Sequence, residues 1–364
     1  MTNSRTRPPS ESWWRPIGGQ QIAPPGPGAS RALRTTHACD AAELPPAPPP
    51  AVVSVGVFDG VHLGHQAILA ANVARAAATE SAPTVVTFGR HPKALLLGRA
   101  PRTLTTLAHR LELFQRAGIA HTVVLPFSEA LRSQSAEDFT RTFLEDGLAA
   151  SALVLGFDNK FGRDREGTPE ALAALGHTVQ VVPKVLVNGR AVSSTAIREA
   201  VSLGDLPAAA SMLGRPPSVF GEVVAGRRLG RELGFPTANL DLHHELHPPA
   251  GVYATLVRRT EPARAPQGSS DSASLLPSVT NIGHRPTVEG ERDRSSGRQS
   301  SQRMTIETHL LDFEEDLYGE HLEVLFLANL RPEEHFPNLA ALTDQIGRDV
   351  AQARKLLAAD SAPS

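Results

Sequence analysis

Two histidines in a glycine-rich stretch, His62 and His65, have the type and spacing that most directly suggest chemistry in this chain. They follow an apolar run that reads as a strand, and they precede a helix-compatible segment, Gln66–Ala78. At such a junction in a parallel sheet, free backbone N–H groups and the helix dipole attract phosphate. Imidazoles add donors whose charge is tunable near neutral pH. The stretch therefore predicts a phosphate site, although a lone histidine is more often structural.

Three further segments are expected to reach the carboxyl ends of the same sheet: Thr87–Pro92, Gly156–Arg163 and Val192–Arg198. The last of these presents the hydroxyls of Ser193 and Ser194 at the start of a helix, with an arginine one turn later. These hydroxyls alternatively cap the helix. Capping and phosphate binding are compatible, because both use the unsatisfied amides of a helix amino terminus.

A second cluster lies at Gly226–Asn239, where glycines permit close backbone approach to phosphate and three arginines form a basic group. Its first half alone is also compatible with a solvated basic hairpin. If the segment that follows Phe235 is extended, Thr237 and Asn239 face the same side and offer two neutral oxygen ligands for one Mg²⁺. The arginines are Arg227, Arg228 and Arg231.

Glu307 is an acidic residue on a predicted strand, where its side chain could face a cleft. On a strand, Glu307 points opposite Ile306 and Thr308, so it can face a cleft while its neighbours pack. An ordinary surface glutamate is the alternative, with about even weight from the pattern alone.

The elements that position the first cluster alternate between short apolar runs and helical patterns, which predicts a Rossmann-like α/β domain with a parallel sheet covered by helices. The strands are expected at Val52–Val57, Thr84–Phe88, Thr122–Leu125, Ala152–Gly156 and Thr178–Val182. The helices are expected at Gln66–Ala78, Thr105–Ala117, Ala136–Ala149, Pro169–Leu175, Ser194–Leu203 and Leu206–Leu213.

After Gly214 the sequence pattern changes to segments of alternating apolar and polar residues, separated by Gly and Pro. This pattern predicts a small antiparallel β-barrel, and a carboxyl-terminal helix is expected after it at Leu339–Leu357. Its strands are expected at Val219–Val224, Gly251–Val257, Met304–Leu311 and His321–Leu327. The resulting domains are a disordered Pro-rich extension at 1–50, an α/β domain at 51–215, a barrel domain at 216–358 and a disordered tail at 359–364. Residues 260–274 and 289–303 read as long disordered loops.

Composition narrows the class of protein. The 364 residues include 36 basic and 38 acidic side chains, and the formal charge of −2 provides no global field for nucleic acid or an anionic membrane. No apolar run is long enough to span a bilayer. The single cysteine, Cys39, excludes an internal disulfide and fits a reducing cytoplasm. We expect a cytoplasmic monomer or weak homo-oligomer with small-molecule partners.

Residues 56–65, with the order Gly-x-Phe-Asp-Gly-x-His-x-Gly-His, resemble the nucleotidyltransferase signature. Together with the other segments they resemble the bacterial bifunctional riboflavin kinase/FAD synthetase family, and Pro-Thr-Ala-Asn at 236–239 resembles its kinase motif. The resemblance covers about 51–357. It implies ATP-dependent phosphorylation of riboflavin to FMN in the barrel and adenylyl transfer to FMN in the α/β domain, both with Mg²⁺.

The resemblance also implies roles for individual residues. Catalytic roles fall to His62, His65, Arg198 and Glu307, with Glu307 as the base that activates riboflavin. Metal contacts fall to Thr237 and Asn239. Substrate contacts fall to Gly56, Phe58, Asp59, Gly64, His91, Asp158, Ser194, Thr195, Gly226, Arg231 and Gly234. The segment Asn281–Thr287 also matches the family and is assigned no catalytic role.

Several positions depart from the family pattern. Gly89 and Arg90 stand where Asp-Pro is usual, Phe157 and Asn159 replace a Glu and an aromatic residue beside Asp158, and Ala196 fills a place often held by Arg. These departures leave two alternatives to a bifunctional enzyme. One is a riboflavin kinase with an impaired adenylyltransferase domain, and the other is a flavin-binding regulator with vestigial sites.

Overall fold

The computed structural model describes residues 33–44, 49–89, 102–226, 229–241, 245–260, 275–284 and 304–359, which form two compact units. The first unit contains the described residues up to Ile197 together with Ser211–Gly214. The second unit contains Arg198–Ala210 and the described residues from Arg215 onward. Several predicted features lie outside the described residues: 1–32, Arg90, His91, Arg227, Arg228, 261–274, 285–303 and the tail from 360.

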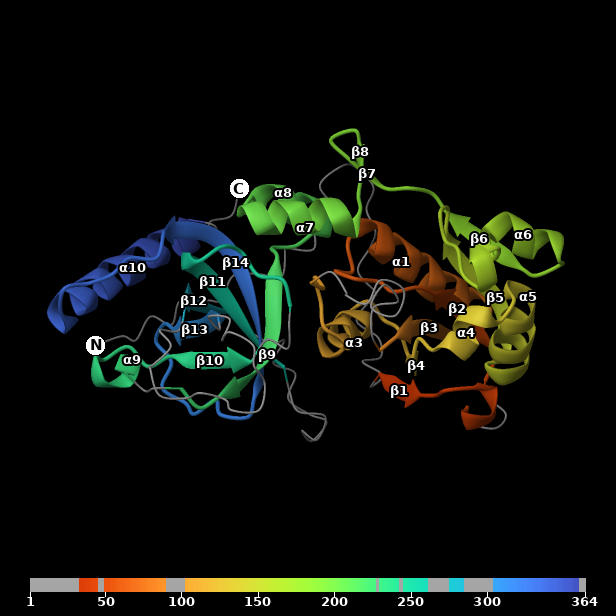
Figure 1. Ribbon diagram of the computed structural model, residues 1–364, viewed down its shortest axis with the longest axis horizontal. Coiled ribbons are helices and arrows are strands. Elements are labelled where there is room, and N and C mark those ends of the chain that lie inside the picture. Colours follow the sequence, from red (N-terminus) through yellow and green to blue (C-terminus); the bar gives the residue numbers. More distant parts are fainter. Residues whose placement is uncertain are drawn as a thin grey trace, which may run out of the picture. The chain divides into compact units, whose positions relative to one another are not determined.

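The first unit is built on a six-stranded parallel sheet in the order β1-β4-β3-β2-β5-β6 (Figure 1). Five of the strands fall where the sequence predicts them, so the expected α/β domain is confirmed. The strands are β1 (Arg34–His37), β2 (Ala51–Val55), β3 (Ala82–Phe88), β4 (His121–Leu125), β5 (Ala150–Gly156) and β6 (Val179–Val182), and a small separate hairpin pairs β7 (Leu186–Val187) with β8 (Arg190–Ala191).

Helices cover both faces of this sheet, because alternate residues of its strands are apolar on both sides. Val53 and Val55 of β2 pack in one core with side chains from η3 and α6, whereas Val52 packs in another core with Ala76 of α1. The helices of the first unit are α1 (Leu63–Ala78), α3 (Leu107–Arg116), α4 (Glu129–Ser133), α5 (Ala136–Asp138), η3 (Phe139–Gly147) and α6 (Pro169–Ala174), with short 3-10 turns η2 (Ala41–Glu43) and η4 (Arg163–Arg165). Two further helices follow, α7 (Ser194–Leu203) and α8 (Leu206–Leu213), and their residues Arg198–Ala210 belong to the second unit.

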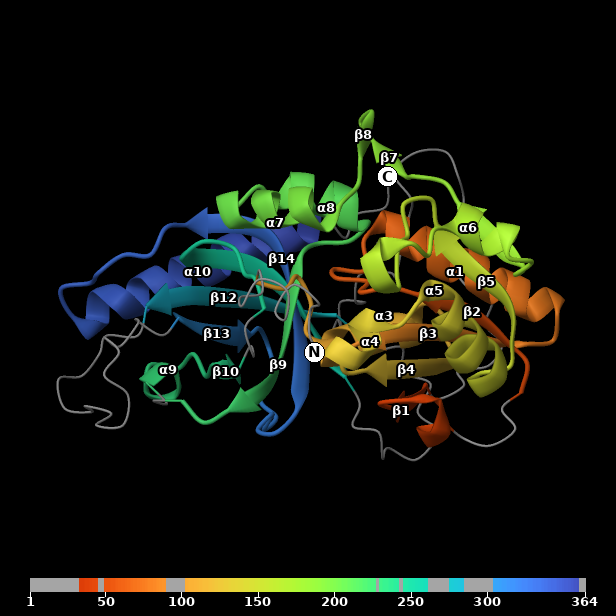
Figure 2. The same ribbon diagram turned by 45° about the vertical axis from the view of Figure 1, so that its right-hand side comes forward.

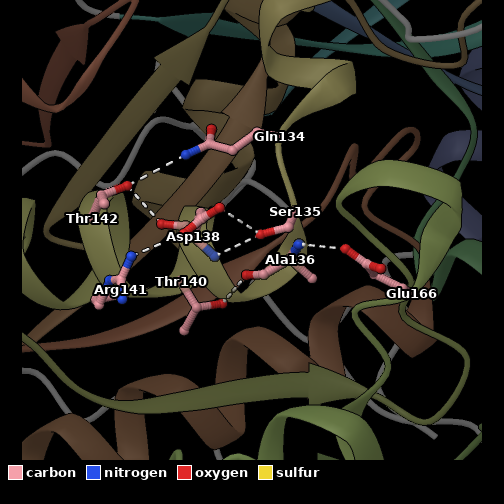
Figure 3. A network of polar contacts seen from close by, with 8 residues as sticks. All are labelled: Gln134, Ser135, Ala136, Asp138, Thr140, Arg141, Thr142 and Glu166. Atoms are coloured by element: carbon pink, nitrogen blue, oxygen red, sulfur yellow. Dashed lines mark hydrogen bonds and ion pairs between the residues drawn. The ribbon is translucent and has the colours of Figure 1, made fainter.

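The segment predicted as one helix at Ala136–Ala149 is instead a single α-turn continued by a π-helix, η3. Two threonine hydroxyls donate to carbonyls four residues earlier: Thr140 to Ala136 at 2.8 Å and Thr142 to Asp138 at 2.6 Å (Figure 3). Side-chain bonds of this kind compete with the backbone for i−4 carbonyls, which favours the wider turn. Glu166 fixes the start of the segment by accepting from the Ala136 amide at 3.0 Å.

The prediction of a disordered extension over 1–50 is wrong for Arg34–His37, which pair in parallel with β4, while residues 1–32 and 45–48 lie outside the described residues. Ala38 and Leu44 then enter the core of the first unit, with exposures of 2% and 7%. The sequence analysis did not predict this strand, because Arg-Thr-Thr-His has no alternation of apolar and polar residues. An edge strand is held by backbone pairing, and propensity patterns report burial rather than pairing.

The second unit is a closed antiparallel barrel in the order β10-β13-β12-β11-β14-β9, which confirms the predicted barrel (Figure 2). Strand β12 was missed because its inward positions Ser278 and Thr280 are polar, although both are fully buried. Their hydroxyls bond to Thr255 instead, each at 2.7 Å. The strands are β9 (Ser218–Val224), β10 (Ala238–Asp241), β11 (Gly251–Thr260), β12 (Leu276–His284), β13 (Met304–Leu310) and β14 (His321–Arg331).

A long carboxyl-terminal helix, α10 (Leu339–Ala359), packs on the outside of β11, β12 and β14. It extends two residues past the predicted end at Leu357. A short helix, α9 (Leu229–Glu232), precedes β10. None of the helices in the described ranges combines the length and the apolar character that crossing a bilayer requires.

The anchoring of α10 leads to a stability prediction. Arg331 donates to the Asp349 carboxylate through Nε at 3.1 Å and Nη2 at 2.9 Å, and this carboxylate is only 3% exposed. Arg331→Ala would leave a buried charge without its partner, so we expect a loss of about 3–5 kcal/mol in the free energy of unfolding. The control is Arg354→Ala, which breaks the exposed pair with Asp312 and should lower stability by less than about 1 kcal/mol. Urea unfolding followed by circular dichroism measures both, and equal losses would contradict the argument.

Candidate active sites

The first site lies where the strand order of the parallel sheet reverses. Strands β2 and β5 are neighbours, and the chain runs outward from them in opposite directions, which is where such sheets bind ligands. A cavity of about 840 Å³ opens at their carboxyl ends, lined in part by Gly56 and Asp158. Asn159, which follows β5, donates from Nδ2 to the carbonyl of Val55 at the end of β2 at 2.7 Å, so it links the ends of the two strands.

The turn after β2 has a strained backbone. Phe58, Gly60 and Val61 have φ angles of 53°, 82° and 40°, and such angles are rare outside glycine. The Asp59 carboxylate holds the turn by accepting from the amides of Leu104 at 2.9 Å and Thr105 at 3.1 Å. Strain that is over-determined in this way is typical of ligand sites.

Phe58 and Asp59 were both predicted to contact substrate, and the structure places both side chains in the interior, at 3% and 4% exposure. Phe58 packs edge-on against the rings of His65 and Phe114. Gly56 lies beneath the Phe58 ring, which leaves 3.1 Å for an added Cβ. These residues therefore shape the turn, and direct contact with substrate stays a prediction.

The two histidines are brought together as expected. His62 caps α1, since its Nδ1 accepts from the His65 amide at 3.3 Å, and the two rings stack with centroids 3.6 Å apart. An accepting Nδ1 leaves the proton of neutral His62 on Nε2. Gly64 makes room for this stack, because an added Cβ would lie 3.3 Å from the His62 ring.

His65 differs from the expectation of a charge that is tunable near neutral pH. Its pKa lies well below the ordinary value because of burial, then the adjacent His62, then Arg110. Its Nδ1 is buried and has no hydrogen-bond partner among the described residues. The ring is therefore a neutral imidazole with a polar atom available to a ligand.

Arg110 on α3 is a site residue that the sequence analysis missed. The buried guanidinium donates from Nη1 to the Val57 carbonyl at 2.6 Å and from Nη2 to the Phe88 carbonyl at 2.9 Å, so it ties the ends of β2 and β3 together. Burial lowers its own pKa and Asp59 opposes this. The sequence did contain a signal for Arg110. It precedes Leu113 by three residues and Phe114 by four, so a helix places all three on the same buried face.

The start of α7 joins the first site through a hydroxyl. Ser194 Oγ donates to the Asp59 carbonyl at 3.0 Å, while Ser193 Oγ accepts from the Ala196 amide at 3.3 Å as the helix cap. The sequence left open which of the two serines caps the helix. Ser193 is the cap of α7, and Ser194 links α7 to the strained turn. Thr195 and Arg198 follow on the same helix, and Arg198 belongs to the second unit.

The second site lies at the ends of strands β9, β10 and β13, where its lining includes the core residues Val223, Ala238 and Leu310. A cavity of about 270 Å³ is lined by Gly226, Arg231, Thr237 and Asn239 on one side. Ala238 and the next inward residue, Leu240, are 8% and 7% exposed, so Thr237 and Asn239 share the outward side as predicted. The opposite wall, which the sequence analysis missed, comes from the segment after β13. Its members are Leu310, Phe313, Glu314, Glu315, Asp316, Leu317 and Tyr318.

Strand register makes Glu307 a neighbour of Asn239, although Glu307 is not among the residues that line the cavity. Asn239 of β10 pairs directly with Glu307 of β13, so their side chains are cross-strand neighbours on the outer face. The preceding loop is braced by His309, whose Nδ1 lies 2.8 Å from the Pro236 carbonyl. Gly234 has a φ of 84° and makes the turn into this loop.

Position 226 needs a residue without a side chain, because the Asn239 side chain packs directly against its backbone. A Cβ at Gly226 would lie 2.1 Å from Asn239 Nδ2. The described residues contain no group of three or more His, Cys, Asp or Glu side chains suited to a metal ion. A cation at this site would therefore share a few neutral protein oxygens with oxygens of the substrate.

Comparison with known proteins assigns a family model to each of two consecutive parts of the chain. Residues 44–196 match the family model described as FAD synthetase, and residues 213–357 match the one described as riboflavin kinase. The bifunctional riboflavin kinase/FMN adenylyltransferase of Pseudomonas fluorescens is 38% identical over 311 residues, covering 84% of this chain and 93% of that protein. The chain belongs to this bifunctional family. The Haemophilus influenzae member is 34% identical over 307 residues, covering 83% of this chain and 92% of that protein.

The fold of the family is shared by a solved structure. The crystal structure of a protein described as a macrolide-efflux protein from Streptococcus pneumoniae matches with a TM-score of 0.71 and 29% identity, covering 88% of this chain and 99% of that one. The likeness therefore extends over both units.

The electrostatics of the first site predict the titration of His65. Its pKa is lowered in the folded protein, so the ring should stay neutral as pH falls below about 6.5, where the unfolded chain takes up a proton. This group therefore reduces stability as pH falls through that value. Imidazole ¹⁵N resonances, assigned with His65→Gln, measure the protonation state. A folded-state titration at or above pH 6.5 would contradict the burial argument, and titration in urea provides the reference.

The close approach of Asn239 to Gly226 predicts that a side chain at position 226 slows FMN formation. Gly226→Ala forces its Cβ against the Asn239 amide, so we expect FMN formation to fall at least about tenfold through displacement of Asn239. Gly347→Ala on α10 is the matched control, because an added Cβ there meets nothing within 4 Å. Initial rates of FMN formation from riboflavin and ATP decide the matter, and a normal rate in Gly226→Ala would refute it.

Proposed function

We infer that this chain makes both flavin cofactors, phosphorylating riboflavin to FMN in the second unit and transferring an adenylyl group from ATP to FMN in the first. The single observation that carries the proposal is that both family matches run consecutively along the chain, each over a unit with its own phosphate-type site. The bifunctional relatives are covered over nearly their whole length.

In the first unit, the FMN phosphate would attack the α-phosphorus of ATP and expel pyrophosphate. The phosphate oxygen itself is the nucleophile, so the protein contributes alignment and charge stabilisation. The Nδ1 of His62 accepts the capping bond, so the proton of the neutral ring lies on Nε2, the atom that would donate to a phosphate oxygen. Neutral His65 adds a second polar group, and Arg198 would hold the triphosphate with its guanidinium fork.

In the second unit, Glu307 would accept the proton of the ribityl 5′-hydroxyl while that oxygen attacks the γ-phosphorus of ATP and ADP leaves. Its place beside Asn239 supports this role, because the base must lie next to the phosphates that Gly226 and Arg231 would bind. The alternative, an ordinary surface glutamate, gives no reason for Glu307 to pair across strands with Asn239 of the kinase motif.

A divalent cation is part of ATP chemistry in such enzymes, and we propose Mg²⁺. The residues fit it, because Thr237 and Asn239 line one cavity and each carries a neutral side-chain oxygen. The cation would reduce the charge on the transferring phosphoryl group.

No observation on the described residues favours the alternative of an impaired adenylyltransferase. Asn159, one of the departures from the family pattern, bridges β2 and β5 through its bond to Val55 and so supports the site. The loop of Arg90 and His91 lies outside the described residues. We further propose a cytoplasmic monomer or weak homo-oligomer, in keeping with the single thiol of Cys39.

Paired variants test the proposal. His65→Ala should abolish FAD formation from supplied FMN and spare FMN formation, whereas Asn239→Ala should do the reverse, because each removes a group from one site only. Chromatographic measurement of FMN, FAD and pyrophosphate gives both rates. Wild-type protein that forms FMN without FAD would support the impaired alternative, and protein that binds flavin without turnover would support the regulator.

A further inference from the structure

The segment Asn281–Thr287 has so far been given no role, and its first residue lies next to the proposed kinase base. Asn281 of β12 pairs directly with Glu307 of β13, on the side opposite Asn239 of β10. The strand order β10-β13-β12 makes these three residues one continuous row across the barrel wall. A carboxylate is thus bracketed by two amides.

All three side chains of this row point to the same face. The inward neighbours of Asn281 are Thr280 and Ile282, both fully buried, and those of Glu307 are Ile306 and Thr308, at 1% and 0% exposure. Since successive strand residues alternate between faces, Asn281 and Glu307 both face outward, as Asn239 does.

The register brings the side chains of Asn281 and Glu307 within reach of each other, although no hydrogen bond joins these two described residues in the structure. Directly opposed residues of antiparallel strands have Cβ atoms about 4.5–5.5 Å apart, within reach of an amide and a carboxylate. The Asn281 amide nitrogen carries two hydrogens, so it can donate to two acceptors.

The second acceptor near Asn281 is the exposed Glu333. A Cβ at Gly283 would lie 3.0 Å from Asn281 Nδ2 and 2.5 Å from Glu333 Oε1, so glycine at 283 leaves room for both groups. The amide of Asn281 and the carboxylate of Glu333 thus both lie beside Gly283.

We propose that Asn281 is a positioning residue for riboflavin phosphorylation, whose amide orients the Glu307 carboxylate toward the substrate hydroxyl from the side opposite Asn239. The inference rests on the proposed role of Glu307. An oriented carboxylate holds its oxygen in line with the proton that it accepts, which affects turnover more than substrate affinity.

The test compares Asn281→Ala with the isosteric Asn281→Asp in the full-length chain, using riboflavin and ATP. Both changes remove the donor, so both should lower kcat for FMN formation by about 10–100-fold, as loss of an orienting partner does elsewhere. The KM for ATP should stay within about twofold. The control is Asn338→Ala, which removes the cap of α10 and should change stability while leaving kcat unchanged.

The outcomes separate this inference from the function on which it rests. If Glu307→Gln retains full turnover, the proposed base is wrong. If Glu307→Gln is inactive while Asn281→Ala has a normal kcat, the positioning role alone is overturned. Recovery of kcat in Asn281→Asp would also overturn it, because the aspartate fills the same space without donating, and Asn281 would then serve only as packing.

Discussion

The first unit depends on one buried carboxylate that holds a strained turn. Asp59 accepts from the amides of Leu104 and Thr105, and this contact stabilises a backbone in which Val61, a β-branched residue, adopts a positive φ. Because the turn is fixed, α1 begins at the point where His62 can cap it and stack on His65. The geometry of the site follows from a contact between segments 45 residues apart.

A buried cation contributes to the electrostatics of this site. The Arg110 guanidinium donates to the carbonyls of Val57 and Phe88, at the ends of β2 and β3, and, after burial and His62, it also lowers the pKa of His65. A cation that is bound to backbone in this way would need no rearrangement for the proposed binding of phosphate.

In the second unit the governing constraint is strand register. A shift of one residue between β10 and β13 would turn Glu307 to the other side relative to Asn239, because side chains alternate with a period of two. The closed barrel removes that freedom, since each of its strands is paired on both sides. Register thus does for the barrel what the Asp59 contact does for the α/β unit.

The sequence by itself determined the α/β alternation, the barrel and the family, because each is encoded in local periodicity or in short motifs such as 56–65 and 236–239. Only the tertiary structure decided that β1 joins the sheet, that Ala136–Ala149 is largely a π-helix, that the buried Arg110 ties the ends of β2 and β3 together, and that Asn281 flanks Glu307. These features arise from backbone pairing, competing side-chain bonds and register between distant segments. A local pattern records which face of an element is buried, and it does not record which segment covers that face.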